Sequence, residues 1–415
     1  MLAQAADQLA FGEVIANRLV ELAALSDEPV RLTRLYLGPA HRRATDLVAY
    51  WMRDAGMSVR VDPLASVVGR YEAGDGGGKT LLIGSHIDSV RNAGRFDGPL
   101  GVVTAIEVVK AAFKSGKRFP FAIEVVAFGD EEGVRFASTL SGSRALAGTF
   151  DESALDELDE DAISRREALT AFGCDLSRLA DEKRPADRCI GYIEVHIEQG
   201  PVLEKDGLPL GVVTAIDGVT RGTVDVEGVA GHAGTVPMSM RHDALAAAAE
   251  MLLAVEERAR TQPNLVATVG KLEVPRSAPN TIPGRARFTL DIRSPSDDER
   301  TNAVADIKDT IAAIAQRRGV MQRYTLGHQA AAAHCDERLS DQLAAAAQAC
   351  GETPKRMPSG AGHDAMAFDK IMPFAMLFVR CRGGVSHNPD EFASPADIDI
   401  AARVLAAFLD RIETS

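Results

Sequence analysis

His86 and Asp88 lie two residues apart at the end of an extended stretch that begins with the apolar run 80–83. A buried strand that ends in His-x-Asp delivers an imidazole and a carboxylate to the carboxyl edge of a sheet, where α/β enzymes place their sites. Residues of the same two chemical types follow in glycine-bearing loops or after other apolar runs: Asp97, Glu131, Glu132, His196 and His387. Imidazole and carboxylate ligands suit zinc, manganese and cobalt, so the sequence predicts a divalent metal site.

The expected ligand set holds three imidazoles and two carboxylates: His86, Asp97, Glu132, His196 and His387. Five ligands that include a bridging carboxylate suit two ions, which lie roughly 3.5–4 Å apart in such sites. Asp97 is the natural bridge, because a carboxylate has two oxygens and an imidazole has one free nitrogen. Asp88 is placed to accept the other ring N–H of His86 and so to fix its tautomer. Each residue alone has an ordinary alternative, as a core histidine or a turn aspartate, but the combination favours a metal site.

The adjacent residues Glu131 and Glu132 suggest a division of labour. At the end of a strand, successive side chains point to different faces, so one carboxylate can bind metal while the other lies over a nearby water. A free carboxylate in that place is a general base that takes the proton of the water and later delivers it to a leaving amine. Adjacent glutamates are usually solvated, but the run 121–128 before this pair is almost wholly apolar.

The elements that must position these residues alternate between strands and helices over the first half of the chain. Helical spacing marks 11–25, 41–56 and 99–115, and extended runs are 58–70, 80–83, 121–128 and 191–196. This alternation predicts a mainly parallel sheet. The polar stretch 151–188 is expected to form short helices that act as an insertion or a cover.

The glycine-rich stretch 74–80 resembles a phosphate-binding loop but departs from that motif twice. The first glycine of the motif falls on Ala73, and the stretch leads into a strand rather than a helix. A hairpin-like turn is therefore the expected structure.

A second module begins at about residue 210. Its expected strands are 212–216, 223–229, 265–274 and 286–292, and its expected helices are 243–260 and 297–317. These elements predict an α+β module with a predominantly antiparallel sheet. The α/β pattern then returns, with expected helices at 337–350 and 396–412 and a strand at 373–379. We therefore expect an α/β catalytic domain formed by residues 1–210 and 330–415, with an inserted α+β lid and dimerisation domain formed by residues 211–329.

Composition and charge narrow the possible classes of protein. The chain has 415 residues, of which 46% are hydrophobic and 25% charged, an ordinary globular composition. The net charge of -13 argues against nucleic acid as the main partner. The five cysteines include no Cys-x-x-Cys pair, which predicts free thiols in a reducing compartment. The start of the chain has no basic signal-peptide region and no stretch reaches about 18 apolar residues, so we expect a cytoplasmic protein without a membrane span.

Several stretches carry a resemblance to a known family. They are 84–89, 94–98, 130–136, 196–201, 231–238, 280–283, 359–365 and 386–389. In content and order they resemble the M20-type metallo-amidohydrolases, and within these the hydantoinase/carbamoylase family. The peptidase branch of M20 usually has an acid where His196 stands, so the stretch that begins there favours an amidase over a peptidase.

The resemblance implies a homodimer with a centre of two Zn²⁺ or Mn²⁺ ions. It assigns the five ligands given above, with Asp97 bridging, and it makes Glu131 the general base with Asp88 beside it. It also implies that His232 stabilises the oxyanion of the tetrahedral intermediate, which this histidine tends to reach across a dimer interface.

The same resemblance implies how the substrate is held. Asn280 and Arg293 would bind its carboxylate and amide, and the planar fork of an arginine suits a carboxylate. Gln199 and Arg221 fall at positions that contact substrate in relatives, although a helix-start glutamine and a surface arginine are the ordinary alternatives. Two residues near the site in relatives, His363 and Asp364, receive no role. Four histidines match nothing and are expected to be surface or capping residues: His41, His242, His328 and His334.

Within the family, residues 231–241 and 376–384 most resemble the allantoate amidohydrolases, including the plant-type enzymes. Thr220 before Arg221 matches the plant type, whereas some relatives have two arginines there. We therefore expect cleavage of a ureido C–N bond in a small carboxylate, with allantoate giving ureidoglycine, CO2 and ammonia. N-carbamoyl-L-amino acids and ureidoglycolate are the alternative substrates, and a non-catalytic metal-binding protein of the same fold is the remote alternative.

Overall fold

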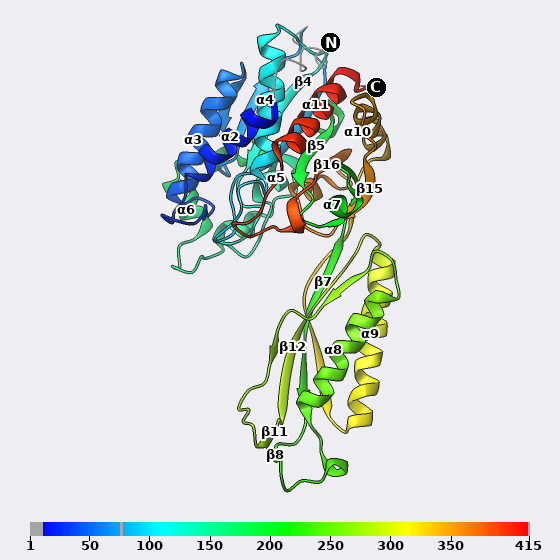
Figure 1. Cartoon of the computed structure of the whole chain (residues 1–415). Coiled ribbons are helices and arrows are strands. Elements are labelled where there is room, and N and C mark those ends of the chain that lie inside the picture. The colour runs from blue at the N-terminus through cyan, green and yellow to red at the C-terminus, as the bar shows by residue number, and fades with distance from the viewer. Residues whose placement is uncertain (1–10, 75–77, 414–415) are drawn as a thin grey trace. The chain divides into compact units, whose positions relative to one another are not determined.

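The computed structural model describes residues 11–74 and 78–413, which form two compact units (Figure 1). Unit 1 runs up to Thr214 and includes Cys335–Met357 and the residues from Gly362 onward. Unit 2 comprises Ala215–His334 and Pro358–Ala361, so it is an insertion in the sequence of unit 1. The expected α/β fold with an inserted α+β domain is confirmed.

The larger sheet has nine strands and a parallel centre. Its strands are β1 (Ser58–Val61), β2 (Val67–Tyr71), β3 (Thr80–His86), β4 (Ala122–Phe128), β5 (Cys189–Ile197), β6 (Leu210–Ile216), β14 (Ala333–His334), β15 (Lys355–Ser359) and β16 (Phe374–Val379). Their order is β1-β2-β4-β3-β5-β16-β6-β14, with β15 paired to β6. The pairs β4–β3, β3–β5 and β5–β16 are parallel. Every residue of β4 and β5 is buried, as their largely apolar sequences require of central strands covered on both faces.

Five helices share one hydrophobic core with this sheet. They are α2 (Phe11–Ala23), α3 (Pro39–Asp54), α4 (Pro99–Lys114), α10 (Glu337–Ala349) and α11 (Pro395–Arg411). On the opposite face, the short helix η5 (Asp364–Phe368) contacts β5 and β16, and its Phe368 ring stacks on Tyr192 of β5. The helix α5 (Ser141–Ala147) packs against η5. The remaining short helices of unit 1 are η1 (Glu152–Asp156), α6 (Arg165–Ala171), η2 (Leu176–Glu182), η3 (Ala186–Arg188), α7 (Val202–Asp206) and η6 (Arg382–Gly384). The first four confirm the short helices expected in 151–188.

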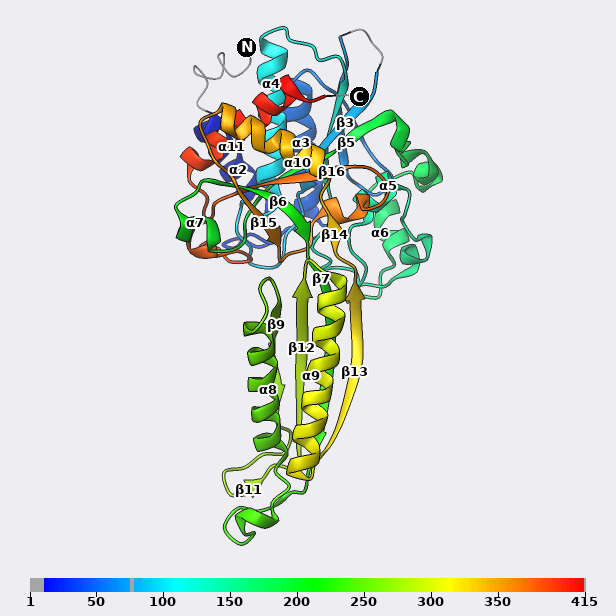
Figure 2. The ribbon, with the colours of Figure 1, turned by 90° about the vertical axis from the view of Figure 1, so that its right-hand side faces the viewer.

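Unit 2 is an antiparallel sheet with two helices on one face (Figure 2). Its strands are β7 (Gly218–Glu227), β9 (Val266–Thr268), β10 (Leu272–Glu273), β12 (Arg285–Ser294) and β13 (Met321–Ala330), in the order β10-β12-β7-β13 with β9 also paired to β12. The helices are α8 (Ala244–Arg260) and α9 (Asp297–Arg318). β8 (Gly231–His232) and β11 (Thr281–Ile282) form a separate two-stranded sheet, and the short helix η4 (Met238–Met240) follows β8 in the chain. Apolar residues alternate along β7 and β12 toward the helices, and the other face of the sheet carries polar side chains.

The structure differs from the expected strands and turns in three places. The strand 212–216 belongs to the larger sheet as part of β6, because it pairs with β16 rather than with unit 2 strands. The strand β13 was not predicted, since it is a largely exposed edge strand with weak apolar alternation. The stretch 74–80 joins β2 to β3 without forming a hairpin, because β4 lies between these two strands; residues 75–77 of that stretch lie outside the described residues.

Two expectations concern the chain as a whole. Within the described residues, no helix is both long enough and apolar enough to cross a membrane. All five cysteines are free thiols, as their scattered positions predict.

Candidate metal centre

The predicted ligands come from the carboxyl edge of the parallel strands. His86 ends β3 and His196 lies at the end of the neighbouring strand β5. Glu132 and His387 lie in the loops that follow β4 and β16, and Asp97 lies just before α4. Because these strands run parallel, their ends meet at one edge, which is where α/β folds bind ligands.

Asp97 lies at the centre of this cluster. Its Oδ1 is 3.2 Å from Nε2 of His196 and 3.5 Å from Nε2 of His86. Its Oδ2 is 3.3 Å from Nε2 of His387, and that nitrogen is 3.5 Å from Oε2 of Glu132. The two oxygens of one carboxylate therefore face two different sets of donor groups.

The donor set fits two divalent cations. His86, Asp97 and His196 form one group, and Asp97, Glu132 and His387 form another. Within each group the possible ligand atoms all lie within 4.8 Å of one another. Because imidazole nitrogens and carboxylate oxygens converge in both groups and Asp97 belongs to both, the arrangement suits two ions that share one carboxylate.

The electrostatics of the cluster also favour cations. Burial, together with the nearby Asp97 carboxylate, raises the pKa of Glu132 to about 7. Burial acts in the same direction on Asp97, but hydrogen bonds with His196, His387 and His86 outweigh it and hold the pKa of Asp97 well below its usual value. A cation between these carboxylates would offset both their desolvation and their mutual repulsion.

Glu131 lies beside the ligand groups but belongs to neither of them. Its Oε2 is 4.0 Å from Nε2 of His86. Burial, with repulsion from Glu132 added, raises the pKa of Glu131 well above its ordinary value. A carboxylate that lies beside two groups of possible metal ligands and belongs to neither has the position of a general base.

Asp88 connects His86 to the two glutamates. Its Oδ1 accepts a hydrogen bond from the backbone N–H of Glu131, and its Oδ2 accepts one from that of Glu132, both at 3.2 Å. The ring Nδ1 of His86 lies 3.1 Å from the backbone carbonyl oxygen of Asp88 and 3.5 Å from its Oδ1. Asp88 therefore fixes the backbone of both glutamates, and its carbonyl oxygen lies nearer than its carboxylate to the ring nitrogen.

The turn that presents Glu131 has a strained backbone. Asp130 has a φ of 72°, in the left-handed region, which costs of order 1–3 kcal/mol for a residue other than glycine. Its buried carboxylate accepts hydrogen bonds from Nη1 of Arg165 at 2.6 Å and from the hydroxyl of Ser141 at 2.5 Å. Sequence reasoning missed Arg165, because nothing in the polar stretch around it distinguishes it from a surface arginine.

Three polar side chains hold the loop of Asp97. The amide of Gln199 and the hydroxyl of Ser386 each lie 2.8 Å from Asp97 Oδ2. Glu391 Oε1 accepts the backbone N–H groups of Phe96 at 2.8 Å and of Asp97 at 3.1 Å. The sequence analysis missed Ser386 and Glu391, although their closeness to His387 in the chain was a usable signal. A substrate contact for Gln199 stays a prediction.

A third group of possible ligands is formed by Glu194, His196 and His363. The Glu194 carboxylate already accepts hydrogen bonds from the hydroxyl of Ser85 at 2.8 Å and from the backbone N–H of Ala365 at 3.1 Å. The ring of His363 packs against that of His196 with 4.5 Å between centroids. We assign no metal to this group, and read it as packing that holds His196 in place.

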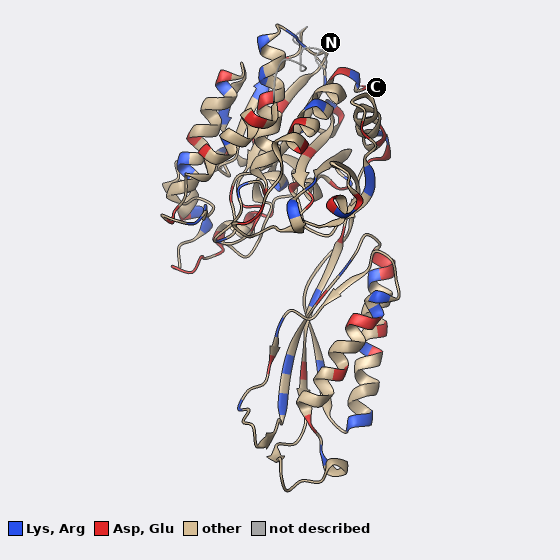
Figure 3. Ribbon diagram, viewed as in Figure 1, with Lys and Arg blue, Asp and Glu red and all other residues tan. Residues whose placement is uncertain are grey.

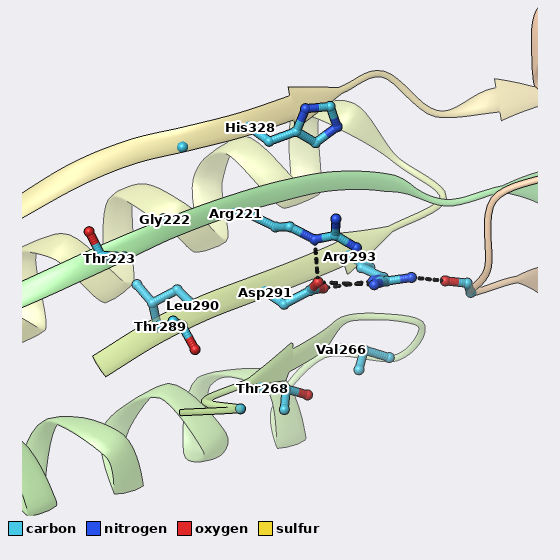
Figure 4. A pocket seen from close by; sticks show the side chains of 13 residues that line it. Arg221, Gly222, Thr223, Val266, Thr268, Thr289, Leu290, Asp291, Arg293 and His328 are labelled. Atoms are coloured by element: carbon cyan, nitrogen blue, oxygen red, sulfur yellow. Dashed lines mark hydrogen bonds and ion pairs between the residues drawn. The ribbon is translucent and has the colours of Figure 1, made fainter. Parts of the chain in front are cut away.

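The predicted substrate residues lie at two different places in unit 2. His232 of β8 is paired with Thr281 of β11, next to Asn280. Arg221 of β7 and Arg293 of β12 instead line a hollow of about 820 Å³ on the open face of the sheet, which we call the sheet hollow (Figure 4). Its other walls include Val266, Thr268, Leu290, Asp291 and His328. The structure brings His232 close to Asn280, and Arg221 close to Arg293.

One of the four histidines expected at surface or capping positions is buried instead of exposed. His41 is fully buried in α3, where its Nδ1 accepts a hydrogen bond from the backbone N–H of Leu37 at 3.2 Å. Burial lowers the pKa of His41 to about 4, so this ring is neutral at pH 7. His328 is exposed as expected, but it lines the sheet hollow.

Comparisons with known proteins agree with this geometry. The model of "Peptidase family M20/M25/M40" matches residues 82–411. An amidase of the hydantoinase/carbamoylase family from Burkholderia multivorans superposes with a TM-score of 0.91 at 33% identity, over 96% of this chain and 97% of that one. The chain belongs to the hydantoinase/carbamoylase family of M20 amidases.

Two kinds of curated relative match this M20 amidase equally well. Allantoate deiminase 1 of Glycine max is 41% identical over 98% of this chain and 90% of that protein. N-carbamoyl-L-amino acid amidohydrolase of Geobacillus stearothermophilus is also 41% identical, over 95% of this chain and 97% of that protein. The predicted family and class are confirmed: the protein is an amidohydrolase that acts on carbon–nitrogen bonds other than peptide bonds.

Proposed function

We propose that this M20 amidase uses two divalent ions, Zn²⁺ or Mn²⁺, to hydrolyse a ureido C–N bond of a small carboxylate. The observation that carries the proposal is the pair of ligand groups that share Asp97, with Glu131 beside them and in neither group. Asp97 provides possible ligand atoms to both groups, and the carboxylate of Glu131 remains available for proton transfer. Both features suit hydrolysis at a dinuclear centre.

Each residue has a separate task in the proposed mechanism. Ions bound at such a centre polarise a carbonyl group and ease the ionisation of water near neutral pH. Glu131 takes the proton of the attacking water and delivers it to the departing nitrogen. Asp88 keeps Glu131 aligned through its backbone N–H. His232 donates a hydrogen bond to the carbonyl oxygen as negative charge develops there, and Arg293 binds the substrate carboxylate.

Allantoate is the substrate we propose first, with ureidoglycine, CO2 and ammonia as the products. The plant allantoate deiminases support it, since three of them share 41% identity with this chain. An N-carbamoyl-L-amino acid is the second candidate, because the Geobacillus stearothermophilus enzyme is equally similar. Ureidoglycolate is less favoured, since the Ureidoglycolate hydrolase of Oryza sativa subsp. japonica shares 33% identity.

The test is ammonia release by the metal-loaded protein from allantoate, ureidoglycolate and a panel of N-carbamoyl-L-amino acids. We expect the highest kcat/KM for allantoate. A higher kcat/KM for an N-carbamoyl-L-amino acid would show that this compound, and not allantoate, is the preferred substrate. Absence of ammonia release from every compound, with two ions bound per chain, would overturn the proposed function.

The distance between the two groups of predicted substrate residues in unit 2 supports a homodimer. Arg293 lies near one end of β12, which runs from Arg285 to Ser294. The pair β8–β11, which contains His232 and directly follows Asn280, lies beyond the other end of β12 (Figure 1). Eight residues of extended strand at about 3.3 Å each separate Arg285 from Arg293, which is roughly 26 Å. A small ureido acid is much shorter than this, so both ends of unit 2 serve one substrate only if they come from two subunits.

The exposed surface near His232 also supports association. Val229, Met238 and Met240 are 61%, 77% and 68% exposed in the segment that carries this histidine. Arg241 holds the same segment through hydrogen bonds to the carbonyl oxygens of Ala233 at 2.6 Å and Val236 at 3.0 Å. An ordered loop with exposed large apolar side chains is typical of a surface that another subunit covers.

Mixed dimers of two inactive variants test this arrangement. We expect His232→Ala and Arg293→Ala each to lose at least about 10²-fold in kcat/KM when made alone, the cost of one oxyanion donor or one carboxylate anchor. A mixed dimer with one chain of each kind, purified through two different affinity tags, has one site with both residues intact and one site with neither. We therefore expect ammonia release at about half the wild-type rate per dimer.

The control is the doubly tagged dimer in which both chains carry His232→Ala, which should stay inactive. If the mixed dimer is as inactive as this control, His232 and Arg293 of the same chain serve the same site, and the proposed exchange between subunits is wrong.

A further inference from the structure

A carboxylate lies between two arginines at the sheet hollow. Asp291 of β12 is the cross-strand partner of Arg221 of β7, and Arg293 is two residues farther along the same face of β12. Asp291 Oδ2 accepts hydrogen bonds from Nε of Arg221 at 2.8 Å and from Nη2 of Arg293 at 2.9 Å. Its Oδ1 accepts one from Nε of Arg293 at 2.6 Å (Figure 4). One carboxylate therefore orients both guanidinium groups.

The two arginines are held to different degrees. The remaining terminal nitrogen of Arg293, Nη1, donates to the carbonyl oxygen of Gly360 at 2.6 Å, so all three of its nitrogens are anchored. Arg221 is anchored through Nε alone, and among the described residues its Nη1 and Nη2 have no acceptor. The Arg221 side chain is 53% exposed, against 28% for Arg293. A rigid arginine and a half-anchored one with free donors form a prepared receptor for an incoming carboxylate.

Asp291 also sets the charge of the sheet hollow. Burial acts to raise the pKa of Asp291, but the hydrogen bonds from Arg293 and Arg221 outweigh it and hold that pKa below its usual value. Asp291 is therefore ionised at neutral pH. Two guanidinium groups and one carboxylate leave a single net positive charge, and His328 is the one other ionisable side chain in the described lining.

We propose that Asp291 is a positioning and specificity residue, which aims Arg221 and Arg293 at one substrate carboxylate and makes the enzyme favour monoanionic over dianionic ureido acids. This inference rests on the proposed function, in which the two arginines bind the substrate carboxylate. A second negative charge on the substrate would meet Asp291 without a further cation to balance it. A neutral substituent of the same shape would not meet that repulsion.

The variant Asp291→Asn tests the positioning role. It keeps the shape of the side chain and removes its charge, so both arginines lose an ionic acceptor. We expect KM for the best ureido substrate of the wild-type enzyme to rise at least about tenfold, the effect of losing a charge-assisted hydrogen bond. The value of kcat should change less than about threefold, because Asp291 touches no reacting atom.

The pair N-carbamoyl-L-asparagine and N-carbamoyl-L-aspartate tests the specificity role, since the two compounds differ mainly in one negative charge. Both are measured as competitive inhibitors of ammonia release, so neither needs to be turned over. The wild-type enzyme should bind the asparagine compound at least about tenfold more tightly than the aspartate compound. In Asp291→Asn this ratio should fall toward one, and in Asp291→Glu, which keeps the charge, it should be retained.

The matched control is Asp225→Asn. Asp225 lies on the same face of the sheet, with Oδ1 3.2 Å from Nε of Arg287 and Oδ2 3.7 Å from Nη2 of Arg323. Basic and acidic residues both occur along the strands of unit 2 (Figure 3). Its side chain is 23% exposed, close to the 28% of Asp291, but it does not line the sheet hollow. We expect Asp225→Asn to leave KM, kcat and the inhibitor ratio unchanged.

Several results would overturn the inference. Equal effects of Asp291→Asn and Asp225→Asn would show that loss of surface charge explains them. A lower KM in Asp291→Asn would show that Asp291 opposes binding instead of preparing it, and equal binding of both inhibitors by the wild-type enzyme would remove the specificity role. In each case an active wild-type enzyme leaves the proposed function standing, whereas a wild-type protein without activity on any ureido acid would overturn that function itself.

Discussion

Replacing Glu131 with glutamine is expected to lower kcat by about 10²–10⁴-fold, the usual contribution of general acid–base catalysis. The amide keeps the size of the side chain but cannot take a proton from water. Metal content should stay at the wild-type value, because Glu131 belongs to neither ligand group. The measurement combines the rate of ammonia release with metal analysis of the same purified sample.

The adjacent residue provides the matched comparison. Glu132→Gln makes the same chemical change one position along the chain, but Glu132 belongs to a ligand group with Asp97 and His387. We expect this variant to lose bound metal, whereas Glu131→Gln keeps it. If Glu131→Gln loses metal and Glu132→Gln keeps it, the two roles are exchanged. If Glu131→Gln keeps near wild-type activity, Glu131 is not the general base.

Replacing Asp97 with asparagine is expected to remove both ions. Asp97 is the single residue that the two ligand groups share, and its two oxygens face different histidines. Loss of a residue that only supports a ligand costs 10–100-fold in metal affinity, so loss of the shared ligand should cost more than about 100-fold at each position. Metal content after dialysis should fall close to zero, and ammonia release should fall with it.

A second aspartate separates this effect from a general loss of charge. Asp181→Asn removes a carboxylate whose side chain is 67% exposed and which pairs with Arg178, its one ionic partner among residues 11–74 and 78–413. This variant should bind metal like the wild-type protein. Retention of one tightly bound ion by Asp97→Asn would mean that one group holds its ion without Asp97, so that Asp97 is a terminal ligand and not a bridge.

The sequence was sufficient to predict that the five expected ligands lie close together, for a physical reason. In a parallel sheet the carboxyl ends of the strands meet at one edge, so polar residues at the ends of successive apolar runs become neighbours in space. His86 and His196 end two such strands, and Glu132 follows a third. The family motifs then distinguished this set from ordinary core and turn residues, and the structure places all five residues together.

The residues that support the ligands were harder to predict, because they act through contacts between distant parts of the chain. Arg165 reaches Asp130 across 35 positions, and Glu391 accepts the backbone N–H of Asp97 across 294 positions. Nothing in the local pattern of either residue marks these contacts. Asp291 differs, since its spacing of two from Arg293 on a strand places both on one face, a signal that was present in the sequence and was not used.

In the fold, too, features that depend on one segment were predicted and features that depend on distant segments were not. The central strands β4 and β5 are almost wholly apolar and were predicted, whereas the edge strand β13 is largely exposed and was missed. The strand β6 was recognised but placed in the wrong sheet, because its partner β16 lies far along the chain. Strand pairing between distant segments is fixed by the packing of the whole domain, which periodicity in one segment does not report.

The most direct measurement is a metal titration of the stripped protein with allantoate as substrate, followed by ammonia release. The protein is freed of metal, its metal content is verified, and Zn²⁺ or Mn²⁺ is added in steps. We predict no ammonia release without metal and a rise to a plateau at about two ions per chain, as two ligand groups that share one aspartate require. Full activity of protein verified to be metal-free would contradict a metal-dependent amidohydrolase, and a plateau at one ion would contradict a dinuclear centre.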